Sequence, residues 1–240
     1  MTFHFLILTF DFTMQKSTWP IIFLIVLAGH LLSIQQQFSL LASCTKPLLL
    51  LSLIAWFIKS TSDITGNFKR IILAALIFSL VGDVWLIFEK SNPFFFIFGL
   101  ICFLAAHVFY IFAFNRIRTN NAVAVKWWLA IFVVAFYFSL NYILFDHLGD
   151  MKIPVLIYGA VISIMLFIAL HFFFVKKPGS TLIVAGALLF ITSDSLLAIN
   201  KFYSSFTNAS MYIMLTYPFA QYYIVKGLIQ YFDTENKMIT

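Results

Sequence analysis

Long apolar stretches fill most of this chain and limit what it can fold into. Runs of about 20 mainly apolar residues follow one another with short polar connectors between them, and a helix needs about that length to cross a membrane. Of the 240 residues, 62% are hydrophobic and 10% are charged. A soluble domain carries about 25% charged residues, since its surface faces water. The pattern therefore excludes a soluble globule and predicts a polytopic membrane protein.

The predicted fold is all-α, with eight transmembrane helices in one bundle and a single domain over residues 1–240. Helices satisfy their own backbone hydrogen bonds, as lipid requires, and no connector is long enough to separate two domains. The N-terminal apolar patch is interrupted by Asp11 and lacks a small-residue cleavage site, so we do not interpret it as a signal peptide. The expected spans are roughly residues 18–36, 41–58, 71–88, 93–114, 127–145, 153–174, 180–199 and 209–230.

Lysine and arginine are distributed unevenly between the two ends of the expected spans. Eleven of the 15 lie in the N-terminal segment, in the second, fourth and sixth connectors, and near the C-terminus. The opposite side holds Lys46, Lys90, Lys152 and Lys201. The positive-inside rule then places both termini in the cytoplasm. We expect the plasma membrane, which is the inner membrane if the source is bacterial.

Two carboxylates lie inside the expected spans, whereas the other seven acidic residues lie in connectors or tails. Asp83 and Asp194 each lie about five residues before the outer end of their helix. At about 1.5 Å per residue, both are expected roughly 8 Å below the non-cytoplasmic boundary. Charged residues inside a membrane are costly and usually functional. A protonated aspartate that ties helices together is the structural alternative.

Polar residues follow each aspartate at similar spacing in the next span. His107 and Tyr110 follow Asp83 by 24 and 27 positions, and Tyr217 and Gln221 follow Asp194 by 23 and 27 positions. The third and fourth spans therefore resemble the seventh and eighth at an offset of 111 residues. Four spans per half would give a parallel 4+4 internal repeat.

Several of these polar residues also have an ordinary structural explanation. His107, beside two alanines, suits a helix contact, and Tyr110, Tyr217 and Gln221 suit hydrogen bonds between helices. Lys46, followed by a proline, could be a cation that extends its side chain to the membrane surface.

Metal, cofactor and nucleic-acid functions are not indicated. The histidines lack the spacing of a helical zinc site, the two cysteines lie in apolar surroundings, and no nucleophile elbow occurs. The cations are scattered singly rather than gathered in a basic patch, so no nucleic-acid partner is expected.

Two carboxylates at one depth suit general acid–base catalysis without a covalent intermediate. One carboxylic acid would donate a proton while the second carboxylate orients water. A site of this kind within the bilayer would act on a lipid headgroup or its linkage.

The polar segments together resemble a known family. They are Lys46-Pro47, Gly82-Asp83, Phe98-Gly99 with Phe103, Ala106-His107 with Tyr110, Ser193-Asp194-Ser195, and Thr216-Tyr217 with Ala220-Gln221. These segments resemble the YhhN family of eight-span membrane proteins, which includes the lysoplasmalogenases. The resemblance covers roughly residues 20–230.

The resemblance implies an ether hydrolase that cleaves the vinyl ether bond of a lysoplasmalogen drawn from the bilayer. The products would be a fatty aldehyde and glycerophospho-ethanolamine or -choline. Asp83 and Asp194 would be the catalytic acid and base, in an order that the sequence leaves open. The expected substrate-binding residues are Lys46 for the phosphate, together with His107, Tyr110, Ser193, Tyr217 and Gln221.

A transporter is the alternative from a different class. The paired aspartates would then relay protons to couple uptake of a small solute or lipid, and the two halves would rock against each other. The expected position of the carboxylates toward one face, rather than at the midplane, favours the hydrolase.

Overall fold

The structure is a computed structural model that describes residues 18–64 and 66–239, with side chains placed as far as Thr234. The predictions for the N-terminal segment, including Lys16, lie outside the described residues. The described chain is all-helical, with no β-strand in it. Its α-helices are α1 (Trp19–Gln35), α2 (Ser39–Ser60), α3 (Asn67–Ile87), α4 (Pro93–Asn120), α5 (Trp128–Leu144), α6 (Lys152–Leu170), α7 (Ser180–Ala198) and α8 (Ala209–Ile239). Short 3₁₀ turns η1 (Phe145–His147), η2 (Gly149–Met151) and η3 (His171–Phe174) and a π turn η4 (Ile199–Tyr203) extend some of them.

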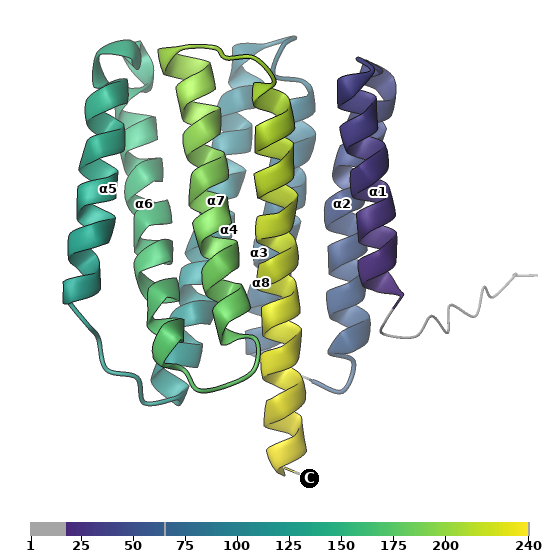
Figure 1. Cartoon of the computed structure of the whole chain (residues 1–240), viewed down its shortest axis with the longest axis vertical. Helices are drawn as coiled ribbons and strands as arrows, with labels where there is room; N and C mark the ends of the chain where they lie inside the picture. Colours follow the sequence, from purple (N-terminus) through teal and green to yellow (C-terminus); the bar gives the residue numbers. More distant parts are fainter. Residues whose placement is uncertain (1–17, 65, 240) are drawn as a thin grey trace, which may run out of the picture.

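The helices lie side by side and alternate in direction, so the start of α1 and the end of α8 are at the same end of the bundle (Figure 1). Six of the described helical segments are long and apolar enough to cross a membrane: α2, α3, α4, α5 with η1, α6 with its flanking turns, and α7 with η4. Helix α1 is apolar but has 17 residues, and α8 is not among the six. These helices make the chain an integral membrane protein, and the count of eight spans stays a prediction.

Helix α3 begins at Asn67, four residues before its predicted span, and three helices end four or more residues away from the ends of their predicted spans. Helices α4 and α8 run past the expected ends at 114 and 230, to Asn120 and Ile239, because polar residues can continue a helix beyond the apolar stretch that hydropathy detects. The expected span to residue 174 instead ends as an α-helix at Leu170, and its last residues form the 3₁₀ turn η3.

Two helix pairs form the centre of the bundle: α3 packs extensively against α4, and α7 against α8. Small residues permit these contacts. A Cβ atom on Gly82 of α3 would lie 2.9 Å from the Phe103 ring of α4, and one on Gly186 of α7 would lie 2.7 Å from the Ala220 carbonyl oxygen of α8.

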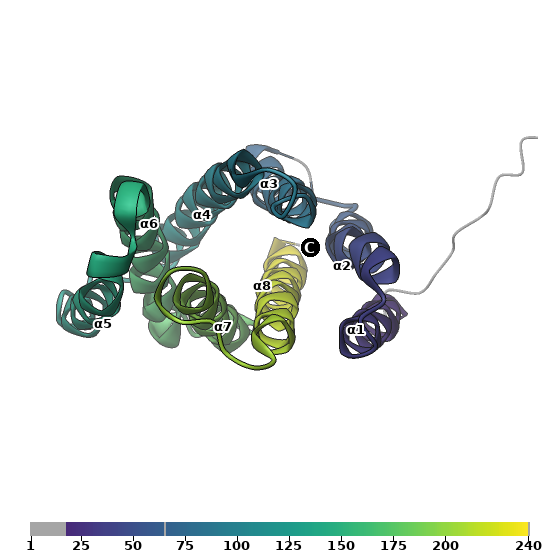
Figure 2. The same cartoon turned by 90° about the horizontal axis from the view of Figure 1, so that it is seen from above.

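The remaining helices flank this centre, with α1 and α2 on one side and α5 and α6 on the other (Figure 2). Helix α2 packs against α3 and α8, and α6 packs against α7 and α4. Helix α1 lies outside α2, and α5 lies outside α6. Helix α2 thus contacts one helix of each central pair, and α6 contacts the other helix of each pair.

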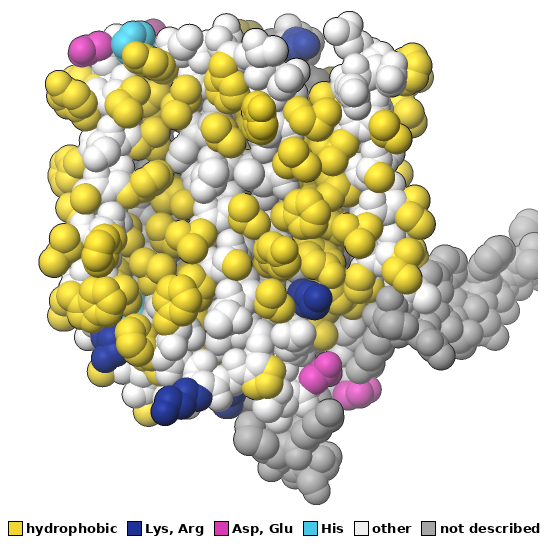
Figure 3. Space-filling model, in the orientation of Figure 1, with side chains coloured by type: hydrophobic (Ala, Val, Ile, Leu, Met, Phe, Trp, Pro, Cys, Tyr) yellow, Lys and Arg dark blue, Asp and Glu magenta, His cyan; other side chains and the backbone are white. Residues whose placement is uncertain are grey.

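Apolar side chains cover the middle of the face seen in Figure 3, and most lysines and arginines on this face lie toward its lower end. On α5, Ile131, Phe132 and Phe138 are each more than 60% exposed. Such a belt suits contact with lipid and would be unfavourable in water.

Candidate functional site

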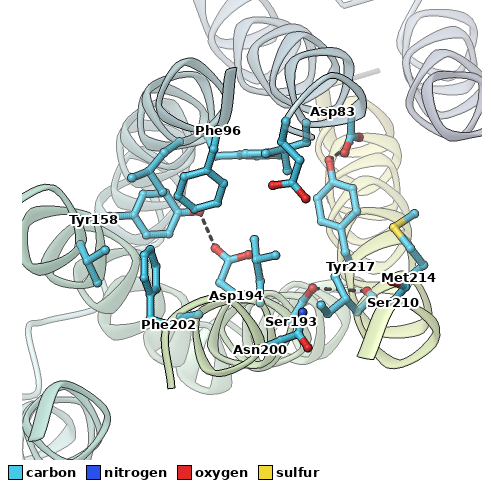
Figure 4. A pocket seen from close by; sticks show the side chains of 18 of the residues that line it. Asp83, Phe96, Tyr158, Ser193, Asp194, Asn200, Phe202, Ser210, Met214 and Tyr217 are labelled. Carbon is cyan, nitrogen blue, oxygen red and sulfur yellow. Dashed lines mark hydrogen bonds between the residues drawn. The ribbon is translucent and has the colours of Figure 1, made fainter. Parts of the chain in front are cut away.

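Asp83 and Asp194 line the same cavity, which has a volume of about 200 Å³. Asp83 projects from α3 and Asp194 from α7, on opposite sides of the cavity (Figure 4). Helices α2, α4, α6 and α8 and the turn η4 complete its wall. The lining side chains include the apolar residues Leu86, Phe96, Leu100, Phe103, Val155, Leu197, Ala198, Phe202, Ile213 and Met214.

Asp83 has a hydroxyl and a cation as partners. The Tyr217 hydroxyl of α8 donates a hydrogen bond to its Oδ2 atom at 2.9 Å. The Lys46 Nζ atom of α2 lies 3.5 Å from its Oδ1 atom. The Asp83 side chain is 2% exposed and that of Lys46 is 17% exposed. Such a countercharge stabilises a buried carboxylate in its ionised form.

Asp194 has a hydroxyl and an imidazole nearby instead. The Tyr158 hydroxyl of α6 donates to its Oδ2 atom at 2.5 Å, and the His107 Nε2 atom of α4 lies 3.9 Å from the same oxygen. Within the described residues, no lysine or arginine lies within ion-pair distance of Asp194. The two carboxylates therefore share a cavity but have different electrostatic surroundings.

The other residues expected from the sequence divide into two groups. Lys46, Ser193 and Tyr217 line the cavity. His107, Tyr110 and Gln221 are fully buried and lie outside its lining.

His107 lies behind Asp194. Its ring packs edge-on against Phe190, at 4.6 Å between centroids, and against Tyr158, at 5.4 Å. Neither of its ring nitrogens has a hydrogen-bond partner among the described residues. It therefore lies beside Asp194 and outside the cavity lining, and its role in substrate binding stays a prediction.

Tyr110 and Gln221 form a buried network. The Tyr110 hydroxyl donates to Gln221 Oε1 at 2.6 Å, and Gln221 Nε2 donates to Ser79 Oγ at 3.0 Å. These bonds join α3, α4 and α8, and substrate binding by Tyr110 and Gln221 stays a prediction.

Three residues at the cavity were not predicted from the sequence: Tyr158, Glu89 and Lys201. Tyr158 lines the cavity but lies in the middle of an apolar stretch of the sequence. The position that follows Lys46 by the offset of 111 residues is directly before Tyr158. Glu89 lines the cavity from the α3–α4 connection and pairs with Lys201 of η4, at 3.2 Å between Oε2 and Nζ. The Lys201 Nζ atom also lies 4.6 Å above the Phe96 ring. The connectors thus supply a polar rim to the cavity.

Comparisons with known proteins agree on one family. The family model described as the YhhN family matches residues 41–228. Human "Lysoplasmalogenase TMEM86B" (Homo sapiens) is 32% identical over 194 residues, which is 80% of this chain and 76% of the human protein. The proteins of the same name from Sus scrofa and Mus musculus are 31% and 30% identical over 195 residues each, covering 81% and 80% of this chain and 78% and 76% of their own. No solved structure matches the chain. The family match spans most of the chain and includes both aspartates, so this integral membrane protein belongs to the YhhN family.

Proposed function

We propose that this protein is an intramembrane hydrolase that cleaves the vinyl ether bond of a lysoplasmalogen. The products are a fatty aldehyde and glycerophospho-ethanolamine or -choline. The names of its relatives support the substrate. The observation that carries the chemistry is the placement of two carboxylates with different partners in one cavity.

The surroundings of the two aspartates suggest their roles. Asp83 lies beside Lys46 and acts as the carboxylate base. Asp194 lacks a paired lysine or arginine among the described residues and holds the proton, so it acts as the acid. Its Oδ2 atom accepts from Tyr158, which leaves Oδ1 free to carry that proton toward the cavity.

The reaction then proceeds in three proton-balanced steps. Asp194 donates its proton to the vinyl carbon farther from the ether oxygen, and the oxygen lone pair forms an oxocarbenium ion. Asp83 takes a proton from the water that attacks the adjacent carbon, giving a hemiacetal. The hemiacetal collapses as Asp83 returns that proton to the departing glycerol oxygen and the hemiacetal hydroxyl reprotonates Asp194.

Other residues of the cavity contribute polar groups and limit the access of water. Lys46 supplies countercharge to Asp83, and its binding of the substrate phosphate stays a prediction. Ser193, Glu89 and Asn200 provide further polar groups for the glycerol or water. Phe96, Phe103 and Met214 limit access of bulk water from the sides, which strengthens the charge interactions within.

We also propose the eight-span topology, with both termini cytoplasmic and the cavity nearer the other face. The 4+4 repeat is supported by the similar contacts that the two aspartates make. Each aspartate is contacted by the preceding helix of its own half, through Lys46 or Tyr158, and by the last helix of the other half, through Tyr217 or His107.

Purified protein in detergent, incubated with lysoplasmalogen and with its saturated ether analogue, tests the reaction. Aldehyde release from the vinyl ether, with no cleavage of the saturated ether, would support protonation of a carbon–carbon double bond. Absence of cleavage of both would contradict the proposal. Uptake into liposomes driven by a pH gradient would then identify the transporter.

A further inference from the structure

A second cavity lies between α5, α6 and α7, with a volume of about 40 Å³. Val155, Tyr158, Asp194 and Ala198 line both this cavity and the larger one. Among the described residues, Asp194 is the one carboxylate that borders both. The second cavity is also lined by Phe136, Tyr137 and Leu140 of α5 and by Gly159 and Ile162 of α6.

This second cavity presents a mainly apolar surface. Asn141 Nδ2 donates to the Tyr137 carbonyl oxygen at 2.8 Å, and the Tyr137 hydroxyl donates to the Leu156 carbonyl oxygen at 3.2 Å. The Ser195 hydroxyl donates to the Ile191 carbonyl oxygen at 2.6 Å. These polar groups therefore bond to the helix backbones, and aliphatic and aromatic groups form most of the remaining surface.

Helix α5 approaches α6 closely at Gly159, since a Cβ atom at this position would lie 3.3 Å from the Tyr137 ring and 3.7 Å from Asn141 Nδ2. Helix α5 lies at the edge of the bundle and packs mainly against α6 (Figure 2). A ligand in this cavity is therefore close to the surrounding lipid.

We propose that the second cavity binds the hydrocarbon chain of a single-chain lipid whose polar end occupies the larger cavity. This inference rests on the proposed function. The reacting bond of a lysoplasmalogen joins a glycerol to an alkenyl chain, so its two sides need surfaces of opposite polarity. Asp194 and Tyr158 lie where the two surfaces meet. The first methylene groups pack against Leu140 and Ile162, and the rest of the chain extends past α5 toward lipid.

Substitutions that fill the second cavity test the proposal through chain-length preference. Ile162→Trp and Leu140→Trp should lower kcat/KM for long-chain lysoplasmalogens by about tenfold, equivalent to roughly two buried methylene groups, and should affect short-chain substrates less. Ile164→Trp is the matched control for Ile162→Trp, because Ile164 lies on the same helix and is 48% exposed. Ile143→Trp is the matched control for Leu140→Trp, because Ile143 lies on the same helix and is 45% exposed. An unchanged chain-length profile in both cavity variants would overturn the inference.

Photo-crosslinking separates this inference from the proposed reaction. A saturated ether lysolipid with a diazirine near the polar end of its chain should label Phe136, Leu140 or Ile162, and Ile162→Trp should reduce that labelling while Ile164→Trp does not. Labelling confined to Phe96 or Met214 of the larger cavity would overturn the inference. Labelling of α5 and α6 in a protein that releases no aldehyde would support the chain site and contradict the hydrolase.

Discussion

Tyr110 and Gln221 are 111 positions apart in the chain, and the Tyr110 hydroxyl donates a hydrogen bond of 2.6 Å to the Gln221 side-chain oxygen. Asp83 and Asp194 have the same separation and share the cavity. Two pairs of residues with this separation therefore lie near the centre of the bundle. The Tyr110–Gln221 contact joins α4 to α8, which also carry His107 and Tyr217, the residues that approach Asp194 and Asp83.

Breaking this hydrogen bond should destabilise the bundle. Tyr110→Phe leaves the Gln221 oxygen buried without its donor, and an unsatisfied buried polar group costs about 1–3 kcal/mol. We expect a lower unfolding temperature in detergent, measured by thermal shift. Adding Gln221→Leu should cost less than the sum of the single changes. Additive effects would show that the two side chains are not energetically coupled.

Substitution of each aspartate should block the reaction at a different step. We expect Asp83→Asn and Asp194→Asn each to reduce aldehyde release by roughly 100- to 10,000-fold, as loss of an acid or base does. In D₂O, Asp83→Asn should still protonate the vinyl carbon reversibly, so recovered substrate should acquire deuterium there. Asp194→Asn should leave recovered substrate unlabelled, because it lacks the acid.

Mass spectrometry of recovered substrate and product distinguishes these outcomes. Asp150→Asn, in the α5–α6 connection, is the control for a carboxylate outside the cavity. Deuterium exchange in Asp194→Asn alone would reverse the assignment of acid and base. Full activity in either cavity variant would remove that aspartate from the mechanism.

The apolar runs made the helical architecture predictable, because hydropathy alone identifies stretches that lipid can surround. Asp83 and Asp194 stood out for the same reason, since a carboxylate within such a run is unfavourable without a partner. Hydropathy detects the apolar stretch and not the end of the helix, so α4 and α8 run past the predicted spans.

Tyr158 was not predictable in this way, because a tyrosine is common in membrane helices. Its role depends on which face of α6 meets α7, and that depends on packing between helices. Glu89 and Lys201 resembled ordinary connector charges, and their position at the cavity depends on how the connectors fold over it. His107 lies close to Asp194 but outside the cavity lining. Spacing along one helix does not tell whether a residue lines a cavity or lies beside it.

Tyr158 should position Asp194 for proton donation. Tyr158→Phe keeps the ring but removes the hydroxyl donor, so we expect kcat to fall roughly 10- to 100-fold with a smaller change in KM. The solvent deuterium isotope effect on kcat should increase as proton transfer becomes more limiting. Tyr142→Phe on α5 is the control, since Tyr142 is 88% exposed. A fall in unfolding temperature without a change in kcat would limit Tyr158 to a structural role.

Substitution of Lys46 tests whether its charge supports catalysis through Asp83 or binds the substrate phosphate. Lys46→Met leaves Asp83 without its cationic partner, so we expect kcat to fall by roughly 100-fold. Lys46→Arg keeps a cation near Asp83 and should retain more activity, and Lys152→Met is the control for a cation that does not line the cavity. Initial rates over a range of lysoplasmalogen concentrations separate kcat from KM. An increase in KM with unchanged kcat would instead show that Lys46 binds the headgroup and that Asp83 works without it.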